Sequence, residues 1–379
     1  MRSTSLWLML LVLFGSPAAA NESGCVYKGM ELRLADVIKP CTRALAEKTL
    51  SKQERAYFLL VRGRAYYSLY KFQEAYADYN AAIALTPNDV NILVARADVL
   101  RIGEPARELN DLNKAMALDP RSPRVLVALC GYKNRNDEFE EAVELCSKAI
   151  SVDPDNTFAY MKRMEAFTVL GDLPRALADA DATVRSSQKV NDREDPNFFW
   201  EDRPRDVRAA ALIKRAEVLQ KAGKRERALQ DFNAAVAVVR DAYTLTRRAQ
   251  ATEGAAAIGD LQEALQQEPR NSTALYTLGL HLMGAQQFET ALNAFERAIE
   301  IRPAYAYAYW MRAKTYRALG QPDVAFDDMM KAIAIDNRIL TQTIPAMHSA
   351  GYWNAEFSQK MTPALMDAIR ACMVDVKCN

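Results

Sequence analysis

Two stretches of this chain follow one 34-residue template: AYFLLVRGRAYYSLYKFQEAYADYNAAIALTPND at residues 56–89 and STALYTLGLHLMGAQQFETALNAFERAIEIRPAY at residues 272–305. Small residues occupy positions eight, twenty and twenty-seven of the template, and large apolar residues occupy positions four, eleven and twenty-four. A proline stands at position thirty-two in both stretches. Such a fixed period is typical of a protein built from stacked copies of one small unit.

Each copy of the template predicts a hairpin of two antiparallel helices. Within each half the apolar positions fall three or four residues apart, which is the spacing of one helix face. The small side chains let the two helices approach closely, while the bulky side chains fill the space beside them. Pro87 or Pro303 lacks a backbone N–H and ends the second helix. Because one hairpin cannot bury its apolar face alone, neighbouring hairpins must stack.

The template resembles the tetratricopeptide repeat family, whose pattern of Leu, Gly, Tyr, Ala, Phe, Ala and Pro these positions match. Further copies follow at residues 123–156, 157–185, 209–239 and 306–337. The copy at 90–122 lacks one residue, and the copy at 240–271 is the least similar, with a second helix that we expect to be short. The resemblance implies an all-α fold: a right-handed superhelical solenoid of about eight helical hairpins with a cap at each end.

On this interpretation the chain has six parts. Residues 1–20 are a signal peptide, 21–55 an N-terminal cap with a disulfide, and 56–185 repeats one to four. Residues 186–206 are an insertion, 207–337 hold repeats five to eight, and 338–379 form a helical C-terminal cap with a cysteine pair.

The first twenty residues, MRSTSLWLMLLVLFGSPAAA, have the layout of a cleavable secretory signal peptide. Arg2 precedes an apolar run from Leu6 to Phe14, and three alanines end the segment. A membrane anchor is the alternative, but the run is shorter than the roughly 20 residues that a bilayer requires. We therefore expect an exported chain, in a bacterial periplasm, with no membrane span after signal cleavage.

The charge balance bears on the class of partner. With Arg2 set aside, basic and acidic residues are equal in number. A net charge near zero gives no whole-molecule attraction to phosphate backbones or anionic lipid, so nucleic acid and membrane surfaces are poor candidates for partners.

The six cysteines predict disulfides. Cys130 and Cys146 hold positions eight and twenty-four of the third repeat, one on each helix and equally far from the turn, so they are expected to face each other. In an exported protein this favours a bridge, worth about 3 kcal/mol for a loop of this size; two buried thiols are the alternative. By proximity, the remaining predicted pairs are Cys25 with Cys41 and Cys372 with Cys378.

No residue pattern predicts catalysis, a metal or a cofactor. Ser186-x-x-Lys189 matches the serine–lysine pattern of penicillin-interacting enzymes, but no Ser-Asp-Asn or Lys-Thr-Gly element accompanies it. His281 and His348 are the chain's two histidines, and neither stands with a cysteine pair at ligand spacing. We therefore expect a protein that is not an enzyme.

Two segments depart from the repeat. The insertion carries the apolar cluster Phe198-Phe199-Trp200, which either packs back onto the solenoid or binds a partner. In the tail, Thr362-Pro363 predicts a helix start. Gly351-Tyr352-Trp353 and residues 362–369 are faintly similar to small peptidoglycan-binding modules, although the Asp-Gly loop of those modules is absent. A plain terminal cap is the alternative.

By the same family resemblance, partners bind in the concave groove lined by the first helices, at repeat positions two, five, nine and twelve. The candidate groove residues are Tyr57, Arg64, Tyr67, Tyr276, Tyr307, Trp310, Lys314 and Arg317. The family's clamp for acidic chaperone tails uses lysine at five and asparagine at nine of its first helix. Leu60 and Arg64 stand there instead, so we do not expect that clamp.

These observations predict a non-catalytic scaffold or adaptor of the cell envelope, which binds a protein or peptide partner in the groove. A peptidoglycan-associated accessory protein, with the cell wall as its partner, is the alternative. An enzyme is the third class, and no residues are assigned to it.

Overall fold

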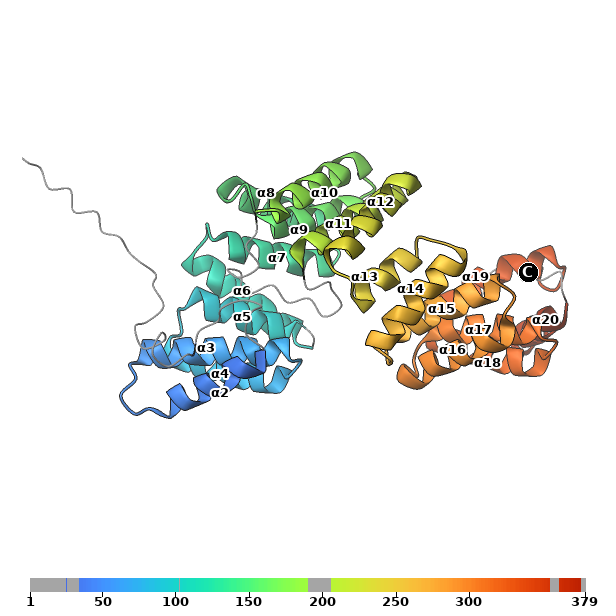
Figure 1. Ribbon diagram of the computed structural model, residues 1–379, viewed down its shortest axis with the longest axis horizontal. Coiled ribbons are helices and arrows are strands. Elements are labelled where there is room, and N and C mark those ends of the chain that lie inside the picture. Colours follow the sequence, from blue (N-terminus) through green and yellow to red (C-terminus); the bar gives the residue numbers. More distant parts are fainter. Residues whose placement is uncertain (1–24, 26–33, 102, 190–205, 355–360, 376–379) are drawn as a thin grey trace, which may run out of the picture. The chain divides into compact units, whose positions relative to one another are not determined.

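Each copy of the template folds into a pair of antiparallel helices, as Figure 1 shows. The computed structural model describes Cys25 and residues 34–101, 103–189, 206–354 and 361–375. Within these residues all regular secondary structure is helical. The chain has two compact units, residues 1–201 and 202–379. The signal segment, Cys378 and Phe198-Phe199-Trp200 lie outside the described residues.

The first unit, blue to green in Figure 1, contains one cap helix and four hairpins. The cap helix is α2 (Leu34–Ala46), which packs on α3. The hairpins are α3 (Lys52–Ser68) with α4 (Phe72–Leu85), α5 (Val90–Leu100) with α6 (Pro105–Leu118), α7 (Pro123–Arg135) with α8 (Phe139–Val152), and α9 (Thr157–Val169) with α10 (Leu173–Ser187). Each second helix also packs on the first helix of the next hairpin, which gives a continuous stack.

The second unit, yellow to red, contains four more hairpins and two terminal helices. The hairpins are α11 (Val207–Lys221) with α12 (Arg225–Val238), α13 (Ala242–Ala249) with α14 (Gly254–Gln267), α15 (Ser272–Gly284) with α16 (Phe288–Ile301), and α17 (Ala306–Ala318) with α18 (Pro322–Ile335). The terminal helices are α19 (Arg338–Ser349) and α20 (Pro363–Val374). Both contact α18.

Three helix boundaries differ from the sequence expectation. The short helix of the copy at 240–271 is its first, α13, with 8 residues, whereas its second, α14, has 14. Helix α3 begins at Lys52, before the template does, because Ser51 and Glu54 form a capping box. Helix α10 continues through Ser187, so the first two residues assigned to the insertion are helical and buried.

An arginine of the first helix pairs with a buried aspartate of the second helix in six hairpins. In each, Nε and Nη2 of the arginine donate to the two carboxylate oxygens at 2.6–2.9 Å. The pairs are Arg62–Asp78, Arg96–Asp111, Arg163–Asp179, Arg215–Asp231, Arg248–Asp260 and Arg312–Asp328. Such paired donors match a carboxylate in both charge and shape.

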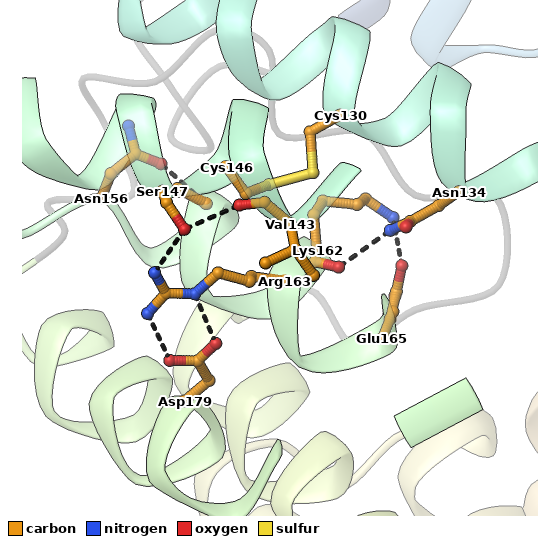
Figure 2. The surroundings of a disulfide bond; sticks show 11 residues. Cys130, Asn134, Val143, Cys146, Ser147, Asn156, Lys162, Arg163, Glu165 and Asp179 are labelled. Atoms are coloured by element: carbon orange, nitrogen blue, oxygen red, sulfur yellow. Dashed lines mark hydrogen bonds and ion pairs between the residues drawn. A yellow bond between two sulfur atoms is a disulfide. The ribbon is translucent and has the colours of Figure 1, made fainter. Parts of the chain in front are cut away.

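The same arginine also reaches the preceding helix. Figure 2 shows Arg163, which pairs with Asp179 and donates from Nη1 to Ser147 Oγ of α8 at 2.8 Å. Nη1 of Arg96 donates to Asn80 Oδ1 of α4 at 2.7 Å. One side chain therefore joins three helices, two of its own hairpin and one of its neighbour.

The small residue at template position eight contacts the large residue at position twenty-four. A Cβ at Gly63 would lie 2.5 Å from the Tyr79 ring, and a Cβ at Gly279 would overlap the Phe295 ring in the same way. In the third repeat Cys130 and Cys146 hold these positions, and they are bonded to each other with their Cα atoms 5.6 Å apart. Figure 2 shows this disulfide. It stands where the two template copies have a glycine–aromatic contact.

The other cysteines lie at the two ends of the described chain. Cys25 is bonded to Cys41 of α2, and both are buried. Cys372 of α20 is disulfide-bonded as well. Because Cys378 lies outside the described residues, the pairing of Cys372 with Cys378 stays a prediction.

Breaking one of the interior ion pairs should destabilise the protein strongly. Arg312 and Asp328 have side-chain exposures of 13% and 3%, so Arg312→Met leaves a buried carboxylate with only the exposed Lys331, whose Nζ lies 3.9 Å away. We expect the free energy of unfolding, measured by urea denaturation, to fall by about 3 kcal/mol. Arg107→Met, in the exposed pair with Glu104, is the control and should cost less than about 1 kcal/mol. Equal losses of unfolding free energy in the two variants would show that the Arg312–Asp328 pair contributes no more to stability than an exposed pair.

A methyl group at template position eight should also be costly. We expect Gly279→Ala to lower the free energy of unfolding by about 1–3 kcal/mol, because the Phe295 ring must shift. Gly284→Ala, at the exposed end of the same helix where a Cβ meets nothing within 4 Å, should be neutral or stabilise by up to about 1 kcal/mol. Urea denaturation of the two variants measures both changes. An unchanged free energy of unfolding in Gly279→Ala would show that the Phe295 ring does not fix the spacing of α15 and α16.

Candidate partner-binding site

The candidate groove residues of the first unit lie on one face of α3. Tyr57, Arg64 and Tyr67 are all half-buried. The hydroxyl of Tyr67 accepts a hydrogen bond from Nη2 of Arg101, the C-cap residue of α5, at 3.2 Å. Arg124 of α7 donates from Nη1 to Asn91 Oδ1 at 3.0 Å. The first three hairpins of this unit therefore each contribute an arginine at or next to the first helix.

Asp98 of α5 lies among these arginines. Burial raises the pKa of its carboxyl, and the positive charges of Arg124, Arg101, Arg135 and Arg64 oppose that rise. Arg135 forms an ion pair with Glu108 of α6. Asp98, Arg101 and Arg124 hold positions nine, twelve and two of their repeats. They were not predicted, because the candidate groove residues came only from repeats one, seven and eight.

Tyr276 of α15 belongs in part to the interior. Its ring centroid lies 5.0 Å from that of Tyr305 and 6.0 Å from that of Phe295. Burial raises the pKa of Tyr276 to about 12. It helps pack two hairpins together, so a substitution there would change packing as well as any binding surface.

The other four candidate residues lie on one face of α17, because they are three or four residues apart. Three of them, Trp310, Lys314 and Arg317, line a pocket of about 480 Å³ that we call the C-terminal pocket. Its remaining lining residues are Met329, Gln342, Thr343, Pro345, Ala346, Ser349, Cys372 and Met373. Tyr307 is not among them, but its hydroxyl accepts from Gln342 Nε2 at 3.3 Å.

The C-terminal pocket is positively charged. Burial, and then the charge of Arg317, lower the pKa of Lys314. Burial also lowers the pKa of Arg317, against the opposing charge of Asp375. The Lys314 ammonium lies 4.6 Å from the centroid of the Trp310 ring, within the range of a cation–π contact. No carboxylate of the described residues forms an ion pair with Lys314.

The indole of Trp310 joins an apolar wall to a polar donor. Its ring packs against the core cluster formed by α17, α18, α19 and α20. Its Nε1 atom is buried, and none of the described atoms accepts a hydrogen bond from it. A buried indole N–H usually has an acceptor.

The tail helices form the far side of the pocket. Thr362 caps α20, its side chain accepting from Leu365 N at 3.2 Å, which confirms the predicted helix start. Helix α20 contributes Cys372 and Met373 to the lining, and α19 contributes Gln342, Thr343, Pro345, Ala346 and Ser349. None of these residues was predicted from the sequence, because the tail does not follow the template.

Ser186 and Lys189 do not form a catalytic pair. Ser186 Oγ accepts from Thr157 Oγ1 at 2.8 Å and donates to the Thr183 carbonyl at 3.2 Å. Lys189 Nζ instead donates to both carboxylate oxygens of Asp155, at 2.7 and 2.9 Å. Each residue is therefore engaged with its own structural partners.

The described residues also bear on metal binding and on membrane insertion. Across them, no cluster of three or more His, Cys, Asp or Glu side chains is arranged to hold a metal ion. None of the helices in this part of the chain combines the length and the apolar character that a membrane crossing needs.

Comparison with known proteins relates the repeat to a family. Residues 276–338 match the model of a tetratricopeptide repeat family. The Hsp70-Hsp90 organizing protein 1 of Glycine max is 24% identical over 54% of this chain and 34% of its own length. A DnaJ protein P58IPK homolog of Arabidopsis thaliana is 24% identical over 48% of this chain and 41% of its own. The chain thus spans less than half of either relative.

A solved structure shares the fold. The structure of the APC/C hetero-tetramer Cut9-Hcn1 aligns with a TM-score of 0.56 and 15% identity, over 81% of this chain and 59% of that chain. The repeat match and this likeness identify the fold as an all-α tetratricopeptide-repeat solenoid.

Proposed function

We propose that this protein is a non-catalytic interaction scaffold of the cell envelope, which binds a segment of a partner protein on the first-helix face of its repeats. The observation that carries the proposal is the C-terminal pocket, where an aromatic ring and two cations face one cavity. Aromatic residues and arginine are the side chains that most often anchor protein interfaces. Neither Lys314 nor Trp310 takes part in the ion pairs that hold the hairpins together.

The relatives are in keeping with a scaffold. One is named as an organizing protein of Hsp70 and Hsp90, and the solved structure with the same fold belongs to a hetero-tetramer. Repeat stacks provide extended surfaces suited to such roles.

The envelope location rests on different observations. The first twenty residues have the layout of a signal peptide. Two disulfides are present in the first unit, and such bonds persist mainly outside the reducing cytosol. The nearly balanced charge, 49 basic against 48 acidic residues, favours a protein partner over nucleic acid.

The proposal is tested by crosslinking and pull-down from an envelope extract. We expect the protein to capture specific partners, and a Trp310→Ala, Lys314→Met double variant to capture at least tenfold less. Lys331→Met is the matched control, because Lys331 also lies over an aromatic ring, that of Tyr309 at 5.8 Å, but outside the pocket. The control should capture as much as the parent protein.

Equal capture by the double variant would contradict binding at the pocket. Recovery of cell-wall material alone, insensitive to the double substitution, would instead favour the peptidoglycan-associated alternative. In that case the exposed Tyr352, whose hydroxyl donates to Asp375 Oδ2 at 2.7 Å, would be the next residue to change.

A further inference from the structure

Two donors of the C-terminal pocket have no partner of their own among the described residues. Lys314 is exposed and forms no ion pair with a carboxylate there. Trp310 Nε1 is buried and likewise finds no acceptor there. Arg317 adds a second positive charge one turn further along α17.

Arg312 and Lys314 lie on the same helix but have different surroundings. Arg312 is matched to the buried carboxylate of Asp328, and the interior arginines of five other hairpins are matched in the same way. Lys314 is exposed and contacts the ring of Trp310 instead of a carboxylate, so its charge is available to an anionic ligand.

Part of the pocket wall is apolar. Met329, Met373, Pro345 and Ala346 form this part of the lining. Methionine side chains adapt to irregular apolar groups, so this wall suits a hydrophobic side chain of variable shape. A volume of about 480 Å³ is that of a small-ligand site and holds a few side chains.

The donors are spread along the helix rather than gathered at one point. Trp310 and Arg317 are seven residues apart, which is about 10 Å along the axis of α17. An extended segment rises about 3.3 Å per residue, so several of its residues cover that length, whereas a single terminal carboxylate does not.

We propose that the C-terminal pocket binds side-chain carboxylates of a partner segment in which acidic and apolar residues alternate. Lys314 and Trp310 Nε1 hold a carboxylate, Arg317 attracts a second one, and the methionine wall receives an apolar side chain. This inference rests on the proposed scaffold function and names the chemistry of its partner.

Peptide binding, measured by fluorescence anisotropy at low salt, tests the inference. The probe is a labelled Leu-Glu-Leu-Glu-Leu peptide with both ends blocked, and its control replaces each Glu by Gln. We expect the Glu peptide to bind at least tenfold more tightly, because hydrogen bonds to charged groups are the stronger ones. In Lys314→Met this preference should fall below threefold, while Lys331→Met should keep it.

Two further variants separate binding from folding. Trp310→Phe keeps an aromatic ring but removes the N–H, so it should reduce the preference for Glu by a few-fold. Lys314→Glu should invert the preference towards a Leu-Lys-Leu-Lys-Leu peptide, a gain of binding that an unfolded protein would not show.

Several outcomes would overturn the inference. Equal binding of the Glu and Gln peptides would show that the pocket binds only the apolar side chains of the peptide. Tight binding of the Gln peptide with a free C-terminus would assign the site to chain-terminal carboxylates instead. If neither peptide binds while capture from the extract still depends on Trp310 and Lys314, the scaffold function stands and the acidic segment is rejected.

Discussion

The buried aspartate of the second helix is the constraint on which most of this stack depends. A carboxylate that is nearly inaccessible to water needs a cation, and each of six hairpins supplies one arginine from its own first helix. The geometry is demanding, because both guanidinium nitrogens must reach both carboxylate oxygens. It therefore fixes the rotation of each first helix relative to its second. Where the arginine also reaches the preceding helix, as Arg163 does, it fixes the spacing between hairpins too.

Two hairpins lack the arginine–aspartate pair and are held together by other contacts. The hairpin of α7 and α8 has leucines where the others have the ion pair, and the covalent bond between Cys130 and Cys146 joins its helices. The hairpin of α15 and α16 has neither and relies on the fit of Phe295 against Gly279. In these two hairpins the contact at template positions eight and twenty-four, one residue along from the places of the ion pair, holds the helices without it.

The sequence predicted the hairpins well because their period is carried by side-chain size, which survives in most copies. It failed at α13, and the ion pair explains why. Arg248 and Asp260 are 12 residues apart, whereas Arg62 and Asp78 are 16 apart. The missing four residues amount to about one helical turn, so α13 is shorter while its arginine still faces the aspartate. Spacing between prolines alone could not assign that deletion to the first helix.

The candidate site was predictable only where its residues belong to the repeat template. Positions on α17 follow from the template, so Trp310, Lys314 and Arg317 could be placed on one face. The opposite wall comes from α19 and α20, whose sequence has no template to align with.

Different positions of each first helix have different roles, and this bears on function. One position forms the ion pair and another packs on the second helix, so these positions tolerate little change. Positions on the remaining face are not committed to holding the hairpin together. In the last repeat this face meets α19 and α20 rather than a further hairpin, and their sequence is free to shape a pocket. Lys314 is exposed at this pocket and contacts the Trp310 ring, while none of the described carboxylates pairs with it. It can therefore pair with an anion that arrives with the partner.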